Sequence, residues 1–119
     1  MENTFFCLST CKTCQRVQEE LGSLLDDVKV QNVKEQNIDA KALDFAKEKT
    51  GSYESLFNKR AMKYRSQGLN KKEISDAEFR ELILGEYTFM KRPLAIVDGE
   101  VYAGHAKKTL EGLKEALNG

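Results

Sequence analysis

The chain has 119 residues, the length of one ordinary domain, and a domain of this size buries roughly two-thirds of the surface that its unfolded chain exposes. Lysine plus arginine equals aspartate plus glutamate at 19 each, so no net charge draws the protein to nucleic acid or to an anionic membrane. No stretch approaches the roughly 18 apolar residues of a membrane span, and the start, MENTFFCLST, does not fit a signal peptide. We therefore expect a cytoplasmic protein, in which three cysteines are more often catalytic, redox-sensing or metal-binding than structural.

A strand, a helix and a second strand are predicted first. The segment TFFCL, residues 4–8, is apolar and too short for a solitary helix, so it is predicted to be a buried strand. Apolar residues then recur at helical spacing at Cys14, Val17, Leu21, Leu24 and Leu25. This pattern places Cys11 at or just before the start of a helix. A second strand is expected within residues 26–33, with apolar positions at Val28, Val30 and Val33.

Helix-start signals dominate the middle of the chain. Asp39 is the expected N-cap of a helix over about residues 40–49, and Gly51 supplies the stop. A short helix is expected within residues 53–60. Ser75 begins an S-x-x-E capping box, which predicts a further helix directly after it.

A hairpin and a final helix complete the predicted order. PLAIV and EVYAG are short apolar runs joined by Asp98-Gly99, a dipeptide suited to a type I′ turn. The last helix carries Leu110, Leu113 and Leu117 on one face. The sequence shows no repeat, no low-complexity run and no linker, so we expect one α/β domain over residues 1–119, with a helical insertion at about 39–87.

Two cysteines lie three residues apart at the predicted junction of strand and helix, in LSTCKTCQRV. At a helix N-terminus, unpaired backbone N–H groups and the positive end of the helix dipole favour the thiolate, so Cys11 is placed to be acidic. Cys14 lies one turn later, near enough to attack an adduct on Cys11, as a resolving thiol does. The alternative is that Cys14 is a small core residue and Cys11 an incidental cap, because free cysteine is among the most buried residue types.

A metal site is a further alternative to the redox interpretation of the cysteines. Cys7, Cys11 and Cys14 form C-x3-C-x2-C, which superficially resembles the cluster motif of radical S-adenosylmethionine enzymes, but those enzymes need a much larger barrel-like domain. A zinc site would need a fourth ligand, for which His105, the sole histidine, is the candidate. Since the cysteines would have to converge from a strand, a cap and a helix, we expect no metal. We expect Cys7 to be a core residue and His105 a solvated one.

Pro93 is the only proline and stands at the entrance to the hairpin. Proline cannot donate to a sheet ladder, so it belongs at a strand's first residue, and X-Pro is the one common context for a cis bond. A plain strand start is one interpretation. However, strand, cysteine-bearing helix, proline-led hairpin and final helix together form the thioredoxin-like layout, in which such a proline faces the cysteine motif.

Three segments, STCKTCQRV, LFNKRAMKYRSQGL and FMKRPLAIVDGEVYAG, resemble the arsenate-reductase-like ArsC/Spx family of thioredoxin-fold proteins, along nearly the whole chain. The resemblance implies a mixed four-stranded sheet, built as βαβ and then ββα, with an inserted helical lobe. By this resemblance Cys11 matches the nucleophile, and Arg92 matches the arginine before the cis-proline, Pro93. Arg60 matches the middle arginine of Spx-like members, whereas glutaredoxin-linked arsenate reductases carry that arginine where this chain has Asn58.

A third arginine of those reductases is missing, because this chain reads AGHAKK after the hairpin, where Lys107 or Lys108 could compensate. Planar guanidinium groups and helix N-terminal amides suit an oxyanion. Lys63 and Arg65 are better explained as a solvated helix face. The candidate catalytic residues are Cys11, Cys14, Arg60 and Arg92, and the candidate substrate-binding residues are Thr10, Lys12, Thr13, Asn58 and Pro93.

Three functions fit these residues. The first is a thiol-dependent reductase of the arsenate-reductase type. The second is a Spx-type redox-sensing regulator that binds RNA polymerase through its α subunit. The third, for which the missing arginine is the motivating feature, is a general glutathione-dependent thiol:disulfide reductase. We expect no bound cofactor, a small oxyanion or thiol substrate, glutathione, glutaredoxin or thioredoxin as reductant, and a monomer without direct contact to nucleic acid or membrane.

Overall fold

The structure is a computed structural model that describes residues 2–118. These residues form two compact units. One unit comprises the chain up to Gln36 together with the chain from Arg92 onward, and the other comprises Asn37–Lys91. The second unit contains the segment that the sequence predicts as an insertion. Within residues 2–118, no helix combines the length and the apolar character needed to cross a membrane.

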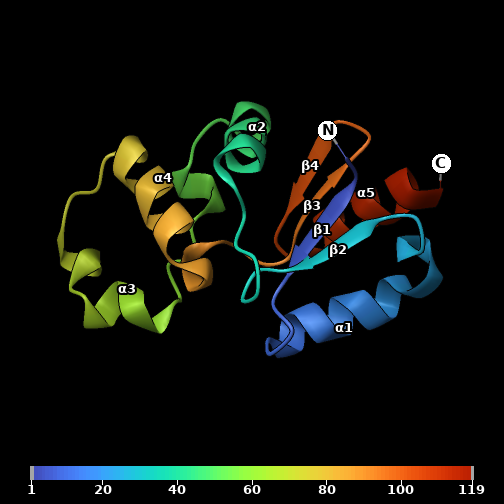
Figure 1. Cartoon of the computed structure of the whole chain (residues 1–119), viewed down its shortest axis with the longest axis horizontal. Coiled ribbons are helices and arrows are strands. Elements are labelled where there is room, and N and C mark those ends of the chain that lie inside the picture. The colour runs from blue at the N-terminus through green and yellow to red at the C-terminus, as the bar shows by residue number, and fades with distance from the viewer. Residues whose placement is uncertain (1, 119) are drawn as a thin grey trace. The chain divides into compact units, whose positions relative to one another are not determined.

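A mixed four-stranded sheet is the centre of the first unit, as predicted (Figure 1). Its strands are β1 (Thr4–Cys7), β2 (Lys29–Asn32), β3 (Leu94–Val97) and β4 (Glu100–Ala103). They lie in the order β2-β1-β3-β4, with β2 parallel to β1 and the other two pairings antiparallel. The two central strands, β1 and β3, are buried at every position, and their residues are apolar except for Thr4.

The edge strand β2 lies where the sequence predicts it, but its burial differs from the prediction. Val30 is 43% exposed, whereas its neighbour Gln31 is buried. Because β2 pairs only with β1, its outer side stays open to solvent. The Gln31 amide is satisfied inside the protein, since its Nε2 donates to the Gln36 carbonyl at 2.8 Å. The valine pattern therefore located the strand but not its buried face.

The turn between β3 and β4 confirms the predicted hairpin. Asp98 and Gly99 have φ angles of 51° and 79°. A type I′ turn requires positive φ at both central residues, which glycine adopts without steric cost and aspartate tolerates. The hairpin keeps the two antiparallel strands in register from Leu94, opposite Ala103, to Val97, opposite Glu100.

Two helices complete the first unit. Helix α1 (Lys12–Leu21) buries Cys14, Val17 and Leu21, the apolar face predicted from their spacing. Helix α5 (Lys107–Asn118) buries Leu113 and packs against β3, β4 and the turn η1 (Gly22–Leu25) (Figure 1). Gly112 lets α5 approach β4 closely, since a Cβ at this position would lie 3.3 Å from the ring of Tyr102.

The second unit is entirely helical apart from its connections. Its elements are α2 (Ala40–Thr50), η2 (Glu54–Leu56), α3 (Met62–Ser66), η3 (Leu69–Lys71), α4 (Asp76–Gly85) and η4 (Tyr87–Phe89). Asp39 caps α2 as predicted, accepting a hydrogen bond from the Ala42 N–H at 2.8 Å. Ser75 and Glu78 form the predicted capping box at the start of α4.

The short helix predicted within residues 53–60 is only the single turn η2, and α3 was not predicted. Chain pairing explains the difference. Phe57 is extended and forms a β-bridge with Met90, while the Asn58 N–H donates to the Phe89 carbonyl at 2.7 Å. These partners are more than 30 positions away in the sequence, so local propensity could not reveal that they end the helix.

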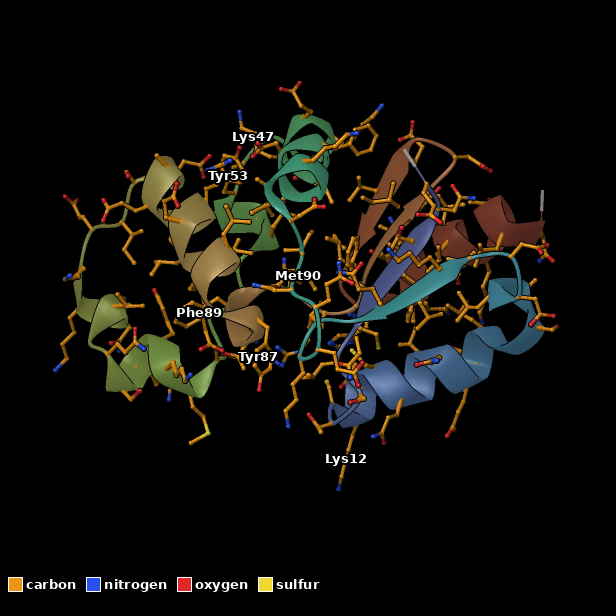
Figure 2. All side chains as sticks on the ribbon, in the orientation of Figure 1. Lys12, Lys47, Tyr53, Tyr87, Phe89 and Met90 are labelled. Carbon is orange, nitrogen blue, oxygen red and sulfur yellow. The ribbon has the colours of Figure 1, made fainter. Side chains whose placement is uncertain are left out.

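Aromatic packing and a polar cluster hold the second unit together. The Phe57 ring packs against Tyr64, Phe79 and Phe89, with centroid distances of 5.4, 4.9 and 5.0 Å. Figure 2 places Phe89, Met90 and Tyr87 along the end of this unit's chain.

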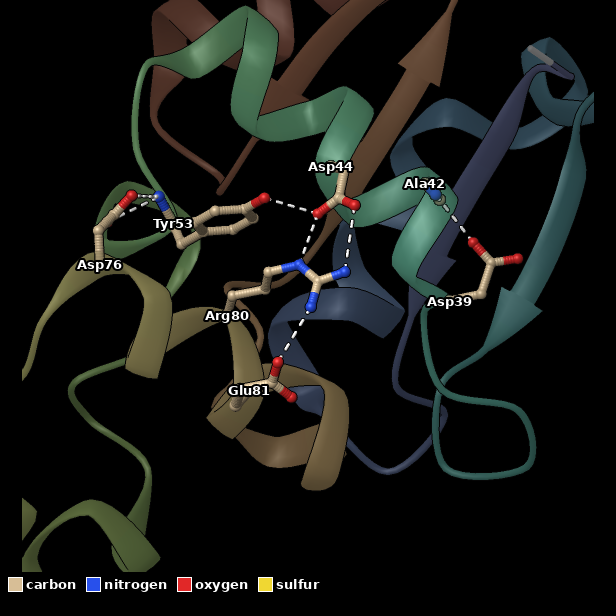
Figure 3. Close-up of polar contacts among 7 residues, drawn as sticks. All are labelled: Asp39, Ala42, Asp44, Tyr53, Asp76, Arg80 and Glu81. Atoms are coloured by element: carbon tan, nitrogen blue, oxygen red, sulfur yellow. Dashed lines mark hydrogen bonds and ion pairs between the residues drawn. The ribbon is translucent and has the colours of Figure 1, made fainter.

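The polar cluster links α2, α4 and the start of η2 (Figure 3). The Arg80 guanidinium donates to both carboxylate oxygens of Asp44, at 2.8 and 3.2 Å, and the Tyr53 hydroxyl donates to the same carboxylate at 2.6 Å. Asp76 accepts hydrogen bonds from the Tyr53 N–H at 3.0 and 3.1 Å. Arg80 and Tyr53 hold the pKa of Asp44 at about 2, well below its ordinary value.

Candidate active site

The first feature of the site is the turn that leads from β1 into α1. The Cys11 N–H donates to the Leu8 carbonyl at 3.0 Å, and the Cys11 carbonyl accepts from the Gln15 N–H at 3.0 Å. Cys11 has extended dihedral angles and is the N-cap of α1, which begins at Lys12. The predicted position of Cys11 at the helix start is therefore confirmed.

Side chains from two neighbouring elements fix this turn. Asn32, at the end of β2, accepts from the Ser9 N–H at 3.3 Å and donates to the Ser9 hydroxyl at 2.9 Å. From the other side, the Gln15 amide donates to the Ser9 carbonyl at 2.6 Å. The turn that carries Cys11 is thus held by the sheet edge and by the helix it starts.

Cys11 is partly exposed, as a nucleophile must be. Its side chain makes no capping hydrogen bond to the first-turn N–H groups of α1. Cys11 is therefore joined to α1 through its backbone, whose carbonyl accepts from the Gln15 N–H.

Cys14 is fully buried on the inner face of α1. Its sulfur accepts a hydrogen bond from the Leu8 N–H at 3.4 Å. Cys7, the last residue of β1, is 3% exposed, so it is a core residue as predicted. All three cysteines are unpaired thiols.

The surroundings of Cys7 and Cys14 shift their pKa values in opposite directions. The neighbouring Cys7 side chain, together with burial, raises the pKa of the Cys14 thiol above its ordinary value. The Cys14 side chain in turn lowers the pKa of the Cys7 thiol, with a smaller contribution in that direction from the charge of Arg92.

The segment entering β3 contributes Arg92 and Pro93 to the same unit. The peptide bond between them is cis. Pro93 is buried, and its carbonyl accepts from the Gly104 N–H at 2.8 Å, which fastens the start of the hairpin to its end. Arg92 is partly buried, and its positive charge contributes to lowering the pKa of the Cys7 thiol.

The remaining candidates of the first unit surround Cys11 in sequence. Thr10 and Lys12 are exposed and Thr13 is partly exposed. Lys12 extends away from the start of α1 into solvent (Figure 2). These residues offer backbone N–H groups at the helix N-terminus, the kind of donor that suits an anion.

Asn58 and Arg60 belong to the other unit. The Asn58 side chain donates to the Thr88 carbonyl at 3.3 Å and accepts from the Arg60 N–H at 3.1 Å. These hydrogen bonds give Asn58 a structural role within its own unit, where it joins the turn before α3 to η4. Arg60 is exposed. The roles of both residues in substrate binding stay predictions.

His105, Lys107 and Lys108 follow the hairpin, and all three are exposed. The exposure of His105 agrees with its interpretation as a solvated residue. Over residues 2–118, no group of three or more histidine, cysteine, aspartate and glutamate side chains is arranged to hold a metal ion.

Sequence reasoning missed the hydrogen bond from the Leu8 N–H to the Cys14 sulfur. It placed Leu8 at the end of the first strand and Cys14 on the buried face of the following helix, without a contact between them. The bond depends on the turn at Leu8–Cys11, where the Cys11 N–H donates to the Leu8 carbonyl.

Comparisons with known proteins agree with this architecture. A family model described as the ArsC family matches residues 6–113. No curated protein matches the chain. Among solved structures, an ArsC family related protein from Bacteroides fragilis is 22% identical, with a TM-score of 0.81 and coverage of 95% of this chain and 99% of that one.

Two further structures are similar over most of their length. A protein described as "a possible arsenate reductase" from Streptococcus mutans is 29% identical, with a TM-score of 0.74, and the match covers 93% of this chain and 96% of that one. The arsenate reductase from Vibrio cholerae is 14% identical, with a TM-score of 0.75 and coverage of 96% and 97%, a likeness that shows the fold alone.

Proposed function

Because the chain belongs to the ArsC family, we propose that it is a thiol-dependent reductase of the arsenate-reductase type, with Cys11 as its nucleophile. The observation that carries the proposal is a partly exposed Cys11 at the N-cap of α1, with Cys14 one turn later on the buried face of the same helix. A nucleophilic thiol with a second thiol nearby can form an adduct and then release it.

For an oxyanion such as arsenate, the proposed reaction moves two electrons from two thiols to arsenic. The Cys11 thiolate attacks arsenic, an arsenic–sulfur bond forms, and one oxygen leaves as water after protonation. A second thiol, from glutathione or from Cys14, then attacks the Cys11 sulfur. The electron pair of the broken bond remains on arsenic, so arsenite leaves and a disulfide is formed.

In this reaction, Arg92 and the backbone N–H groups at the start of α1 stabilise the negative charge of the oxyanion. Guanidinium groups hold oxyanions through paired hydrogen bonds, and helix N-termini add partial positive charge. The name of the Streptococcus mutans protein supports this substrate class. Glutathione, with glutaredoxin or thioredoxin, would return the enzyme to its reduced form.

A second candidate, a general thiol:disulfide reductase, is favoured by the presence of Cys14 one helical turn after Cys11. A second thiol on the same helix can resolve a mixed disulfide within the protein. The same pair could also serve as the switch of a Spx-type regulator that binds the α subunit of RNA polymerase.

The test compares the wild-type protein with Cys11→Ser and Cys14→Ser on two substrates, arsenate and a mixed disulfide of glutathione, with glutathione and glutaredoxin as reductants. The proposal expects Cys11→Ser to abolish both activities. Full arsenate reduction by Cys11→Ser would exclude Cys11 as the nucleophile. Activity on the mixed disulfide without any on arsenate would select the second candidate. Binding of the polymerase α subunit in only one redox state, with neither activity, would select regulation.

A further inference from the structure

The backbone of Leu8 connects the two cysteines of the C-x-x-C pair. Its carbonyl accepts a hydrogen bond from the Cys11 N–H at 3.0 Å, and its N–H donates to the Cys14 sulfur at 3.4 Å. Leu8 directly follows β1, whereas the two cysteines lie at the start of α1. One residue at the end of the strand therefore fixes the turn that carries Cys11 and also contacts the sulfur of Cys14.

The sheet holds the Leu8 N–H in its direction. A trans peptide unit is planar, and its C=O and N–H point in opposite directions. The Cys7 carbonyl, which shares a peptide unit with the Leu8 N–H, accepts a hydrogen bond from the Val33 N–H at 2.9 Å. Leu8, Cys14 and Val33 are all buried, so the bond to the sulfur is shielded from water. The donor is thus aimed at Cys14 before any reaction begins.

A buried Cys14 needs such a donor if it is to react. A thiol attacks a disulfide only as the thiolate. The neighbouring Cys7 side chain and burial both raise the pKa of Cys14. Cys11 acts in the opposite direction with a smaller effect, but its sulfur carries no proton once it is part of a mixed disulfide. Of these groups, the Leu8 N–H is then the one that favours a thiolate on Cys14.

We propose that the Leu8 N–H is a catalytic group of this site, which stabilises the Cys14 thiolate and so makes Cys14 the thiol that resolves a mixed disulfide on Cys11. This inference rests on the proposed function and deepens it. The Cys14 thiolate attacks the Cys11 sulfur, the Cys11–Cys14 bond forms, and the external thiol leaves with the electron pair of the broken bond. The proton of Cys14 passes to the solvent, from which the leaving thiolate takes one up.

The hydrogen bond from Leu8 strengthens as negative charge develops on the sulfur. A neutral thiol sulfur is a weak acceptor, whereas a hydrogen bond to a charged acceptor is roughly twice as strong as a neutral one. The same N–H therefore stabilises the thiolate more than the thiol, and the low dielectric around a buried pair enlarges this difference. Because the direction of the N–H is already fixed, no reorganisation is needed when Cys14 ionises.

The test removes the Leu8 N–H and leaves every side chain unchanged. Because residue 11 is a cysteine, a synthetic peptide of residues 1–10 can be joined by native chemical ligation to residues 11–119 to give the full chain. Leucic acid in place of Leu8 then replaces its N–H by an ester oxygen. A ligated chain with only amide bonds is the reference.

The matched control is an ester at the next position. Glyceric acid in place of Ser9 removes the Ser9 N–H bond to Asn32 at 3.3 Å, which holds the same turn but does not involve a sulfur. Each ester also weakens one preceding carbonyl as an acceptor. The two proteins therefore differ in whether the lost N–H contacts Cys14.

One equivalent of dithiobis(nitrobenzoate) separates the two chemical steps. Attack by Cys11 releases the first thionitrobenzoate at a rate that depends on reagent concentration, and attack by Cys14 releases the second at a rate that does not. We expect the Leu8 ester to slow the second release about tenfold at neutral pH, and the Ser9 ester to slow it no more than about twofold. Equal slowing by both esters would overturn the inference, because only the firmness of the turn would then matter.

The all-amide protein provides a measurement that needs no ester. Ligation allows ¹³C-labelled cysteine in residues 11–119 alone, and with Cys11 alkylated the ¹³Cβ resonance of Cys14 reports its ionisation. The Leu8 amide proton should shift downfield in the same titration step. A Cys14 that stays a thiol up to the pH of unfolding, or a Leu8 proton that does not follow it, would overturn the inference even if the ester proteins fail to fold.

Cys11→Ser in the same release assay separates this inference from the proposed function. An unchanged first release in Cys11→Ser removes Cys11 as the nucleophile. Loss of that release in Cys11→Ser, together with an unchanged second release in the Leu8 ester, removes only the role of the Leu8 N–H.

Discussion

The hydrogen bonds between Asn32 and Ser9 should determine how firmly the Cys11 turn is held. Asn32→Ala removes the bond from the Ser9 N–H at 3.3 Å and the bond to the Ser9 hydroxyl at 2.9 Å, together with a bond from the Lys34 N–H at 3.3 Å outside the turn. A neutral hydrogen bond contributes about 0.5–1.5 kcal/mol net, and Ser9 is exposed enough to be rehydrated, so we expect a loss of about 1–2 kcal/mol. If that loss falls on the turn, the Cys11 N–H should exchange with solvent about 5-fold to 30-fold faster.

The matched control is Asn3→Ala, which loses two bonds at the turn between β3 and β4. Asn3 accepts from the Asp98 N–H at 2.9 Å and donates to the Asp98 carboxylate at 3.4 Å. Urea unfolding should report a similar loss of stability in the two variants, and amide exchange should report faster opening at Cys11 in Asn32→Ala alone. Equal exchange at Cys11 in both variants would refute the reasoning, because the turn would then open only with the whole unit.

Two predictions concern the second unit. Arg80 and Tyr53 keep the pKa of Asp44 at about 2, so the Asp44 carboxylate contributes its full stabilisation above the ordinary carboxyl pKa of about 3.8 and loses it as the pH falls towards 2. The wild type should therefore have a higher urea midpoint than Asp44→Asn at pH 6, and this difference should vanish by about pH 2. A difference that grows on acidification would contradict this sign. Ser75→Ala removes the N-cap of α4 and should lower the free energy of unfolding by about 1 kcal/mol in the same assay, with Ser75→Thr retaining most of it.

Interactions between residues close in the sequence made several elements predictable. The caps of α2 and α4 could be predicted because the side chains of Asp39 and Ser75 each accept a hydrogen bond from an N–H only three residues away. The hairpin was readable because Asp98-Gly99 accommodates positive φ at both positions. The position of Cys11 followed from the change of apolar spacing after the first strand. In each case the partners lie within a few residues, so the sequence contains both sides of the interaction.

Features that depend on partners distant in the sequence could not be predicted. The helical turn ends at Phe57 because Phe57 pairs with Met90. Val30 is exposed because β2 is an edge strand that pairs only with β1. No spacing rule contains either fact, because each arises only when separate elements pack together.

The sequence by itself determined the order of elements, the capped helices, the family resemblance and the identity of Cys11 as candidate nucleophile, since these depend on short-range geometry and on motifs read along the chain. The tertiary structure alone decided that the Leu8 N–H donates to the Cys14 sulfur and that the surroundings of Cys7 and Cys14 shift their pKa values in opposite directions. The physical reason is that a thiol's ionisation is set by the groups packed around it, and here those groups come from β1, α1 and the start of β3, which only the folded sheet brings to one end.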